Sequence, residues 1–204
     1  MEQRTAEWFD ARLGKVTASR VGDLMARTKS GYSASRKNYM AELVIERLTG
    51  KWQDGFESAA MRWGTEIEPM ARSEYEARTG ELVDEVGFID HPSIPMFGAS
   101  PDGLVGTDGG LEIKCPNTAT HIDTLLGGTV EQKYVYQMQT AMACTGRKWW
   151  DFVSFDPRLP ENLSYKCIRF YRDTEMVQSI ENEVIRFLAE LDEMVGRLKN
   201  IKGA

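Results

Sequence analysis

The sequence has few of the residues that build disulfide frameworks or cysteine-ligated metal centres. Its 204 residues include three cysteines and two histidines. Cys115, Cys144 and Cys167 are odd in number and far apart, and no C-x-x-C pair occurs. This pattern favours buried thiols in a reducing compartment. It disfavours a disulfide framework, a structural zinc site or a cysteine-bound cluster.

Long apolar runs are also missing from the sequence. No stretch reaches the roughly 18 consecutive apolar residues of a membrane span, and the residues from Met1 to Thr5 lack the apolar core of a secretory signal. We therefore expect a cytoplasmic protein with no membrane contact. The length and an apolar content of 42% suit a single domain over residues 1–204.

The sequence also lacks an excess of positive charge. The formal net charge is −6, which argues against a protein that coats nucleic acid, although a nuclease needs only one basic groove. Basic residues are nevertheless concentrated in the first forty positions, as Arg12, Lys15, Arg20, Arg27, Lys29, Arg36 and Lys37. A basic groove and an ordinary solvated surface explain this concentration equally well.

Apolar periodicity and turn residues predict a layered α/β domain. We expect helices over 5–13, from a cap at 17–19 through 26, and over 37–48, 57–79, 118–126, 131–145 and 173–199. Strands are expected over 82–89, 97–99, 104–105, 111–115, 149–155 and 163–171, with a polar loop over 28–36. Pro69 should kink or divide its helix. The prediction is a central mixed β-sheet flanked by helices.

The most informative motif joins Ser100-Pro101-Asp102-Gly103 to Glu112-Ile113-Lys114. Side chains alternate along a strand, so Glu112 and Lys114 point to one face and Ile113 to the core. A simple ion pair on the strand is the alternative. The carboxylate of Asp102 ten residues upstream favours a site for a divalent cation, to which the carbonyl of Ile113 adds an oxygen.

Other candidates for the site are weaker when taken alone. Glu68 on the helix 57–79 is a candidate ligand of a second metal ion, and Glu66 is a rival candidate for the same role. The alternative is that Glu68 is an ordinary surface residue. Gln137 and Gln139 hold a metal-bound water or a phosphate, or they are helix surface. Arg12, Ser19 and Ser100 are candidates for gripping a phosphate. The alternative is that Ser19 caps a helix while Arg12 pairs with an acid.

These motifs occur in an order that resembles the phage lambda exonuclease family, also called YqaJ-type viral recombinases. The resemblance rests on the segments 12–19, 63–68, 100–104, 111–116, 137–139 and 155–158. It implies a restriction-endonuclease-like fold of the PD-(D/E)xK class. It also implies a Mg²⁺-dependent 5′→3′ exonuclease that digests one strand of linear duplex DNA from 5′-phosphorylated ends and leaves 3′ overhangs for single-strand annealing.

The resemblance also assigns roles to residues. Asp102, Glu112, the carbonyl of Ile113 and Glu68 would bind two Mg²⁺ ions, for which Mn²⁺ may substitute, and Lys114 would be catalytic. Gln137 would lie near the reactive centre. Arg12, Ser19 and Ser100 would form the pocket for the 5′ phosphate.

The implied partners are duplex DNA ends, a single-strand annealing protein and two further copies of the chain in a homotrimer. Two alternatives to this function stay open. One is a different PD-(D/E)xK enzyme, such as a sequence-specific DNA endonuclease. The other is a non-catalytic DNA-binding ring. Intact acids and lysine disfavour the ring, and cleavage of closed circles would favour the endonuclease.

Overall fold

The centre of the molecule is a five-stranded mixed sheet. The computed structural model describes residues 1–52 and 58–201. In order across the sheet, the strands are β10 (Tyr165–Tyr171), β9 (Trp149–Phe155), β8 (Gly109–Lys114), β7 (Gly103–Val105) and β4 (Val83–Asp84). Only β8 and β9 run parallel, and the other neighbours are antiparallel. The predicted mixed sheet is confirmed.

A smaller sheet lies beside the first. Its order is β1 (Val16–Thr17), β6 (Phe97–Ala99) and β5 (Ile89–Asp90). The strand expected over 82–89 is wrong as one element, because its two ends pair in different sheets as β4 and β5. The short strand β1 falls in a segment for which we expected only a helix cap.

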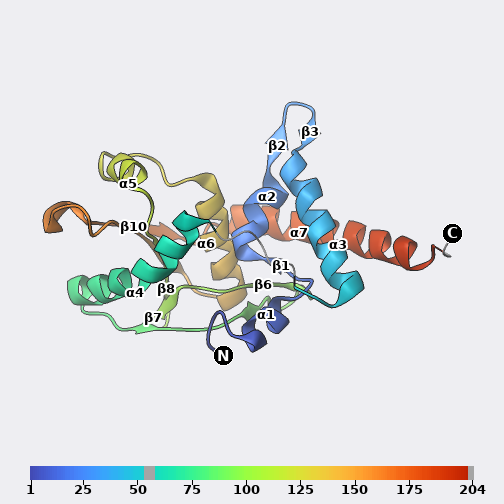
Figure 1. Cartoon of the computed structure of the whole chain (residues 1–204), viewed down its shortest axis with the longest axis horizontal. Coiled ribbons are helices and arrows are strands. Elements are labelled where there is room, and N and C mark those ends of the chain that lie inside the picture. Colours follow the sequence, from blue (N-terminus) through green and yellow to red (C-terminus); the bar gives the residue numbers. More distant parts are fainter. Residues whose placement is uncertain (53–57, 202–204) are drawn as a thin grey trace.

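Helices surround both sheets (Figure 1). They are α1 (Ala6–Arg12), α2 (Val21–Met25), α3 (Ala34–Thr49), α4 (Ala59–Thr79), α5 (Thr118–Leu125), α6 (Gln132–Thr145) and α7 (Thr174–Lys199), with 3₁₀ turns at Ala18–Arg20 and Glu161–Leu163. Side chains of Thr5, Ser58, Asn117 and Asp173 cap four of these helices. Gly50 and Gly80 end α3 and α4 in left-handed conformations, as expected.

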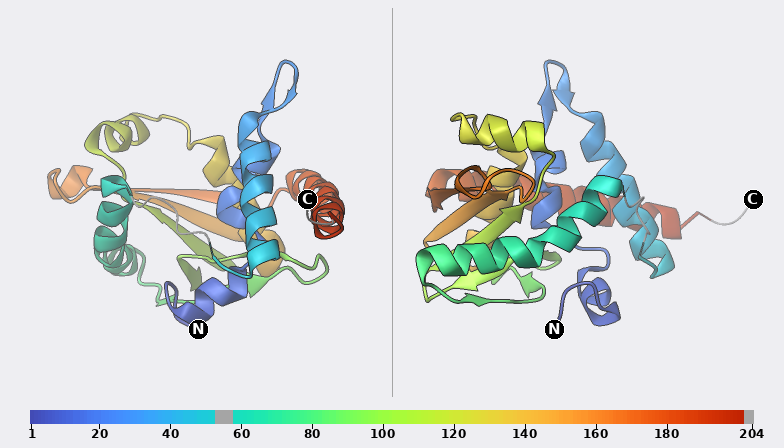
Figure 2. Two further views of the ribbon diagram at one scale, coloured as in Figure 1. Left: turned by 45° about the vertical axis from the view of Figure 1, so that its right-hand side comes forward. Right: turned by 60° about the vertical axis from the view of Figure 1, so that its left-hand side comes forward.

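Alternation along the central strands decides which helix covers which face of the sheet. Leu111 and Ile113 of β8, with Val153 of β9, pack against α4. Trp150 and Phe152 of β9 point the other way and pack against α6. Figure 2 shows α4 lying along one side of the sheet. Glu112 pairs in register with Phe152, so it faces α6.

A separate core joins α2, α3 and α7. The stripe predicted on the last helix is buried there, as Ile180, Val184, Phe187, Leu188, Leu191 and Val195. Burying each large apolar side chain stabilises a fold by about 1.5–3 kcal/mol relative to exposure. This core fixes α2 and α3 against α7, beside the smaller sheet.

The polar segment 28–36 differs most from expectation. Instead of a loop, it contains a hairpin of β2 (Arg27–Thr28) and β3 (Gly31–Tyr32), and α3 already begins at Ala34. The hairpin projects from the molecule at the top of Figure 1. Tyr32 supplies the reason, since its hydroxyl donates to Glu183 on α7 at 2.5 Å and ties the hairpin to that helix.

Two further expectations concern helices. Of the two effects expected of Pro69, a kink or a division, the division does not occur, because α4 runs unbroken from Ala59 to Thr79. The expected start of that helix at 57 lies outside the described residues. Neither Thr17 nor Ser19 caps α2 with its side chain. Over residues 1–52 and 58–201, no helix combines the length and the apolar character needed to cross a bilayer.

Candidate active site

Glu112 and Lys114 form an ion pair on one face of β8. Glu112 is 1% exposed, while Ile113 between them is buried in the core beneath α4. The two side chains share a face as predicted, and the ion pair that was the alternative to a metal site is present. A carboxylate buried in a strand that Leu111 and Ile113 make otherwise apolar is costly without compensation. Lys114 supplies part of that compensation, and its ammonium also lies 5.1 Å from the ring of Tyr134.

Asp102 is fastened to the same strand. Its Oδ2 accepts a hydrogen bond from the backbone N–H of Ile113 at 2.7 Å. The turn that carries Asp102 is held from the other side by Gln3, whose side-chain amide donates to the carbonyl of Pro101 at 2.7 Å. The proline, the glycine and these two hydrogen bonds fix the carboxylate beside Glu112.

Glu68 reaches the same region from α4. Its Oε1 accepts from Arg72 at 2.8 Å, and its Oε2 lies 3.4 Å from Arg4. The rival Glu66 is exposed. Arg72 follows Glu68 by four residues, which is the spacing of an ion pair on one helix face. That spacing was a signal for Arg72 that the sequence analysis did not use.

Electrostatics shows that the three acids lie close together. Burial raises the pKa of Glu112 to about 8, and the charges of Asp102 and Glu68 add to the rise against the opposing effect of Lys114. Burial also raises the pKa of Glu68, with Asp102 again contributing. Burial works to lower the pKa of Lys114, but Glu112 and Asp102 outweigh it and raise the pKa above its ordinary value. Lys114 therefore stays protonated.

The donor set fits a hard divalent cation. Carboxylates and a backbone carbonyl are the ligands that Mg²⁺ and Ca²⁺ prefer, and a cation beside the buried carboxyl of Glu112 would favour its charged form. In the described residues, however, no three His, Cys, Asp or Glu side chains are arranged as a ready metal centre. Ammonium, guanidinium and amide groups compensate these carboxylates instead.

Arg12 and Ser19 line a separate cavity of 430 Å³, together with Lys15, Thr17, Arg20 and Tyr39 among others. Burial lowers the pKa of Arg12 to about 10, so its guanidinium keeps its charge at neutral pH. Over residues 1–52 and 58–201, the Nε of Arg12 has no hydrogen-bond partner. Glu46 lines the same cavity, and its charge opposes the lowering of the pKa of Arg12. A buried guanidinium that faces a cavity is suited to bind an anion.

Ser100 connects this cavity to the carboxylates. It does not line the cavity, but its Oγ accepts from Arg12 at 3.2 Å and from Nε1 of Trp8 at 2.9 Å. Ser100 lies two residues before Asp102 in the same turn. The ring of Trp8 also stacks 3.9 Å from the guanidinium of Arg12. Trp8 precedes Arg12 by four residues on α1, a spacing that places the two side chains on one helix face.

The two glutamines of α6 have different environments. Gln139 is buried, donates to the carbonyl of Tyr171 at 2.8 Å and accepts from the N–H of Asp173 at 2.9 Å. It therefore joins α6 to the start of α7. Gln137 is half-buried. Gln137 lies on the same helix, one turn after Lys133.

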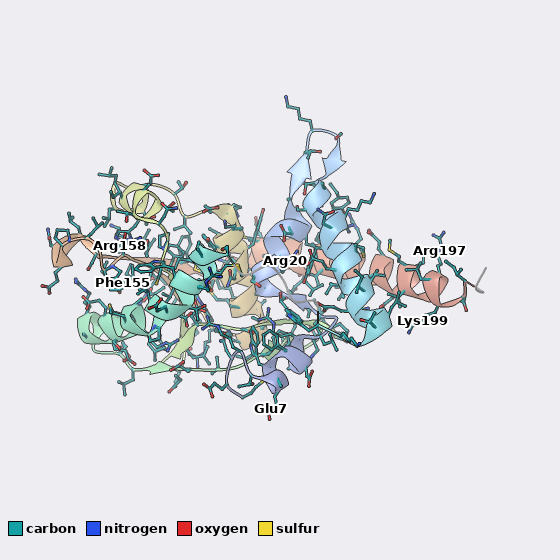
Figure 3. All side chains as sticks on the ribbon, viewed as in Figure 1. Glu7, Arg20, Phe155, Arg158, Arg197 and Lys199 are labelled. Carbon is teal, nitrogen blue, oxygen red and sulfur yellow. The ribbon has the colours of Figure 1, made fainter. Side chains whose placement is uncertain are left out.

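Most of the basic residues near the N-terminus have acidic partners. Lys15 pairs with Asp90 at 2.6 Å, and Arg20 pairs with Asp23 and Glu42. Arg27 and Arg36 pair with residues of α7. Figure 3 shows Arg20 near the middle of the molecule and Arg158 toward its left-hand side. Much of the positive charge concentrated near the N-terminus is thus paired with acids.

The sheet, with its acids and lysine on β8 and the adjoining turn, defines an α/β protein with the restriction-endonuclease-like fold. Residues 7–148 match the family described as the YqaJ-like viral recombinase domain. The chain therefore belongs to the YqaJ-like viral recombinase family.

Solved structures agree with this membership. LHK-Exo in complex with dAMP is 58% identical over 96% of each chain, with a TM-score of 0.90. A second crystal structure, of LHK-Exo as an alkaline exonuclease from Laribacter hongkongensis, has the same identity and coverage and a TM-score of 0.89.

A phage-related exonuclease from Haemophilus somnus 129PT shares the fold, with 17% identity, a TM-score of 0.68 and coverage of 90% of this chain and 96% of that one. Comparison with curated proteins finds no match.

Proposed function

We propose that this protein is a Mg²⁺-dependent exonuclease that digests one strand of linear duplex DNA in the 5′→3′ direction. The observation that carries the proposal is the buried carboxylate of Glu112, paired with Lys114 and joined through the N–H of Ile113 to Asp102. Membership of the YqaJ-like family supports it. So does 58% identity to an alkaline exonuclease.

Each acid has a separate part in the proposed chemistry. Asp102, Glu112 and the carbonyl of Ile113 would hold one Mg²⁺, and Glu68 would help to hold a second, with Mn²⁺ as a substitute. Bound Mg²⁺ supplies Lewis-acid stabilisation of the charge that develops on the phosphate. Lys114 keeps its proton beside Glu112. Its ammonium would therefore act by orienting the attacking water, and Gln137 would contact the same region from α6.

Arg12, Ser19 and Ser100 would make the enzyme an exonuclease by holding the terminal 5′ phosphate. Arg12 brings a buried cation, and Ser100 links it to the turn of Asp102. A phosphate fixed at one distance from the carboxylates places one particular phosphodiester bond at the reacting position. A misplacement of about 1 Å is enough to slow such a reaction roughly a hundredfold.

The same proposal includes partners. The product would be a 3′ single-stranded overhang, which a single-strand annealing protein would bind for recombination. The enzyme would act on DNA ends as a homotrimeric ring. Light scattering checks the assembly, since the proposal predicts a mass about three times the 23.1 kDa of the chain.

Lys114→Ala tests the function. We expect the wild-type protein to shorten the 5′-phosphorylated strand of a linear duplex in Mg²⁺ and to leave closed circles intact. Lys114→Ala should lose at least about a hundredfold in rate, as expected when an oriented water is lost, while still binding the duplex in Ca²⁺. Lys148→Ala is a matched control, because Lys148 is exposed and pairs with Asp108 on the surface.

Three outcomes would count against the proposal. Wild-type protein that leaves the linear duplex intact in Mg²⁺ would exclude a nuclease. Rapid cutting of closed circles would replace the exonuclease with an endonuclease. Full turnover by Lys114→Ala would remove the lysine from the mechanism.

A further inference from the structure

Arg72 contacts three segments of the chain that meet at the acids. Its guanidinium donates to Oε1 of Glu68 at 2.8 Å and to the backbone carbonyl of Asp102 at 3.4 Å. A different nitrogen of the same group lies 2.8 Å from Oε2 of Glu85. One side chain thus connects the carboxylate on α4, the turn that carries Asp102 and the segment after β4.

The surroundings of Arg72 make this connection rigid. Its side chain is 13% exposed, and its Nε is buried. Arg78, two turns further along α4, is a useful contrast. It also pairs with the glutamate four residues before it, Glu74, but it lies on the surface and contacts none of the acids. The two arginines share a helix and the spacing to a glutamate, but Arg78 contacts Tyr165 and the carbonyl of Glu161, away from the acids.

Glu68 is held unequally at its two oxygens. Arg72 binds Oε1 closely, whereas the partner of Oε2 is Arg4, whose side chain is 52% exposed and lies 3.4 Å away. A cation that approaches Glu68 therefore meets one oxygen in a fixed position and one whose partner is exposed to solvent. This asymmetry suits a carboxylate that must present one defined oxygen.

We propose that Arg72 is a positioning residue for the metal site. It holds Oε1 of Glu68 and the carbonyl of Asp102 at the same time, so that the carboxylates from α4 and from the turn stay at one separation. The inference rests on the proposed function, because the acids serve as ligands only in that account. Groups that orient metal ligands from outside are worth about 10–100-fold in metal affinity.

Arginine is required at this position for its shape. Its planar fork reaches several acceptors at once, while a lysine ammonium is a compact point charge on a flexible stem. Arg72→Lys therefore keeps the charge and most of the packing but loses the simultaneous grip on Glu68, Asp102 and Glu85. This difference separates positioning from a general electrostatic effect.

Mn²⁺ binding to the metal-free protein, measured by calorimetry without DNA, tests the inference. Arg72→Ala should weaken binding at least about tenfold, Arg72→Lys should weaken it severalfold, and Arg78→Ala should bind like wild type. In the nuclease assay, the Mg²⁺ concentration for half-maximal rate should rise in parallel for Arg72→Ala. Excess Mg²⁺ should restore much of its kcat.

The outcomes distinguish this inference from the proposed function. Wild-type protein that binds no Mn²⁺ and cuts no DNA contradicts both. Wild-type binding together with unchanged Mn²⁺ affinity in folded Arg72→Ala overturns only the role of Arg72. If Arg72→Ala fails to fold, judged by circular dichroism without metal, Arg72→Lys decides, and an affinity equal to that of wild type overturns the inference.

Discussion

Glu112 has the most demanding environment of any residue in the site. It is enclosed between apolar neighbours on β8, and burial raises its pKa to about 8. One ammonium, that of Lys114, offsets part of the cost. A folded protein keeps such a group when function requires it, because an apolar residue of similar size would be more stable there. The raised pKa of Glu112 is consistent with a site that binds an additional cation.

Arg12 is the corresponding residue in the cavity proposed for the 5′ phosphate. Its guanidinium is buried between the ring of Trp8 and the hydroxyl of Ser100. Lys15 lines the same cavity but forms an ion pair with Asp90 at 2.6 Å. In the proposed function, Arg12 binds the phosphate and Lys15 does not.

The proposed role of Arg12 is tested by comparing the rates at which 5′-phosphorylated and 5′-hydroxyl DNA ends are digested. Arg12→Ala should slow the digestion of 5′-phosphorylated ends at least about tenfold, since a hydrogen bond between charged groups contributes about 1.5–3 kcal/mol. Digestion of 5′-hydroxyl ends should change much less. Lys15→Ala is the control and should keep the preference for phosphate. An equal loss on both kinds of end in Arg12→Ala would contradict the phosphate pocket.

Spacing along the sequence predicted the residues of the site but not their partners. Glu112 and Lys114 are two apart on a strand, and geometry alone places them on one face. The link between Arg12 and Ser100 spans 88 residues and depends on how α1 docks onto the turn. The pairing of Arg4 with Glu68 spans 64 residues. Contacts of this kind follow from tertiary packing, which no local pattern contains.

At the scale of elements, β8 decides the position of the site. Its first two residues are Gly109 and Gly110, and the rings of Trp149 and Trp150 on β9 lie against them. A Cβ on Gly110 would approach the ring of Trp150 to 2.3 Å. Absence of side chains at these positions lets β8 and β9 pair in parallel and brings Glu112 level with Phe152.

Gly110→Ala should therefore destabilise the protein by about 1–3 kcal/mol, the usual cost of overfilling a packed core. Gly196→Ala is a contrasting variant, because nothing lies within 4 Å of a Cβ added there in α7. It should stabilise the protein by about 0.5–1 kcal/mol. Urea unfolding measures both changes. A Gly110→Ala protein as stable as wild type would show that the close packing of Trp150 is not needed.

Long elements were predictable and short ones were not. The stripe on α7 and the strands β9 and β10 are long enough for periodicity to identify them. The hairpin of β2 and β3 is built from two-residue strands, and it is ordered by the bond from Tyr32 to Glu183 on a helix 151 residues later. The segment 82–89 contributes to two sheets, which an alternating pattern cannot reveal.

At the scale of the molecule, three distant segments meet around the acids. The N-terminal segment binds the turn of Asp102 through Gln3, α4 brings Glu68, and β8 brings Glu112. The cavity proposed for the phosphate is linked to this meeting point by the hydrogen bond from Arg12 to Ser100. An overall charge of −6 does not conflict with the proposed DNA substrate, because the proposal needs positive charge only locally, at Arg12 and Lys114.

The account depends on whether the acids around β8 bind a divalent cation. Anomalous diffraction from crystals soaked in Mn²⁺ measures this directly. We predict an anomalous peak within about 2.0–2.4 Å of carboxylate oxygens of Asp102 and Glu112, and its absence in Glu112→Gln crystals soaked in the same way. No peak at these residues in the wild-type protein, or a peak that persists unchanged in Glu112→Gln, would contradict the account.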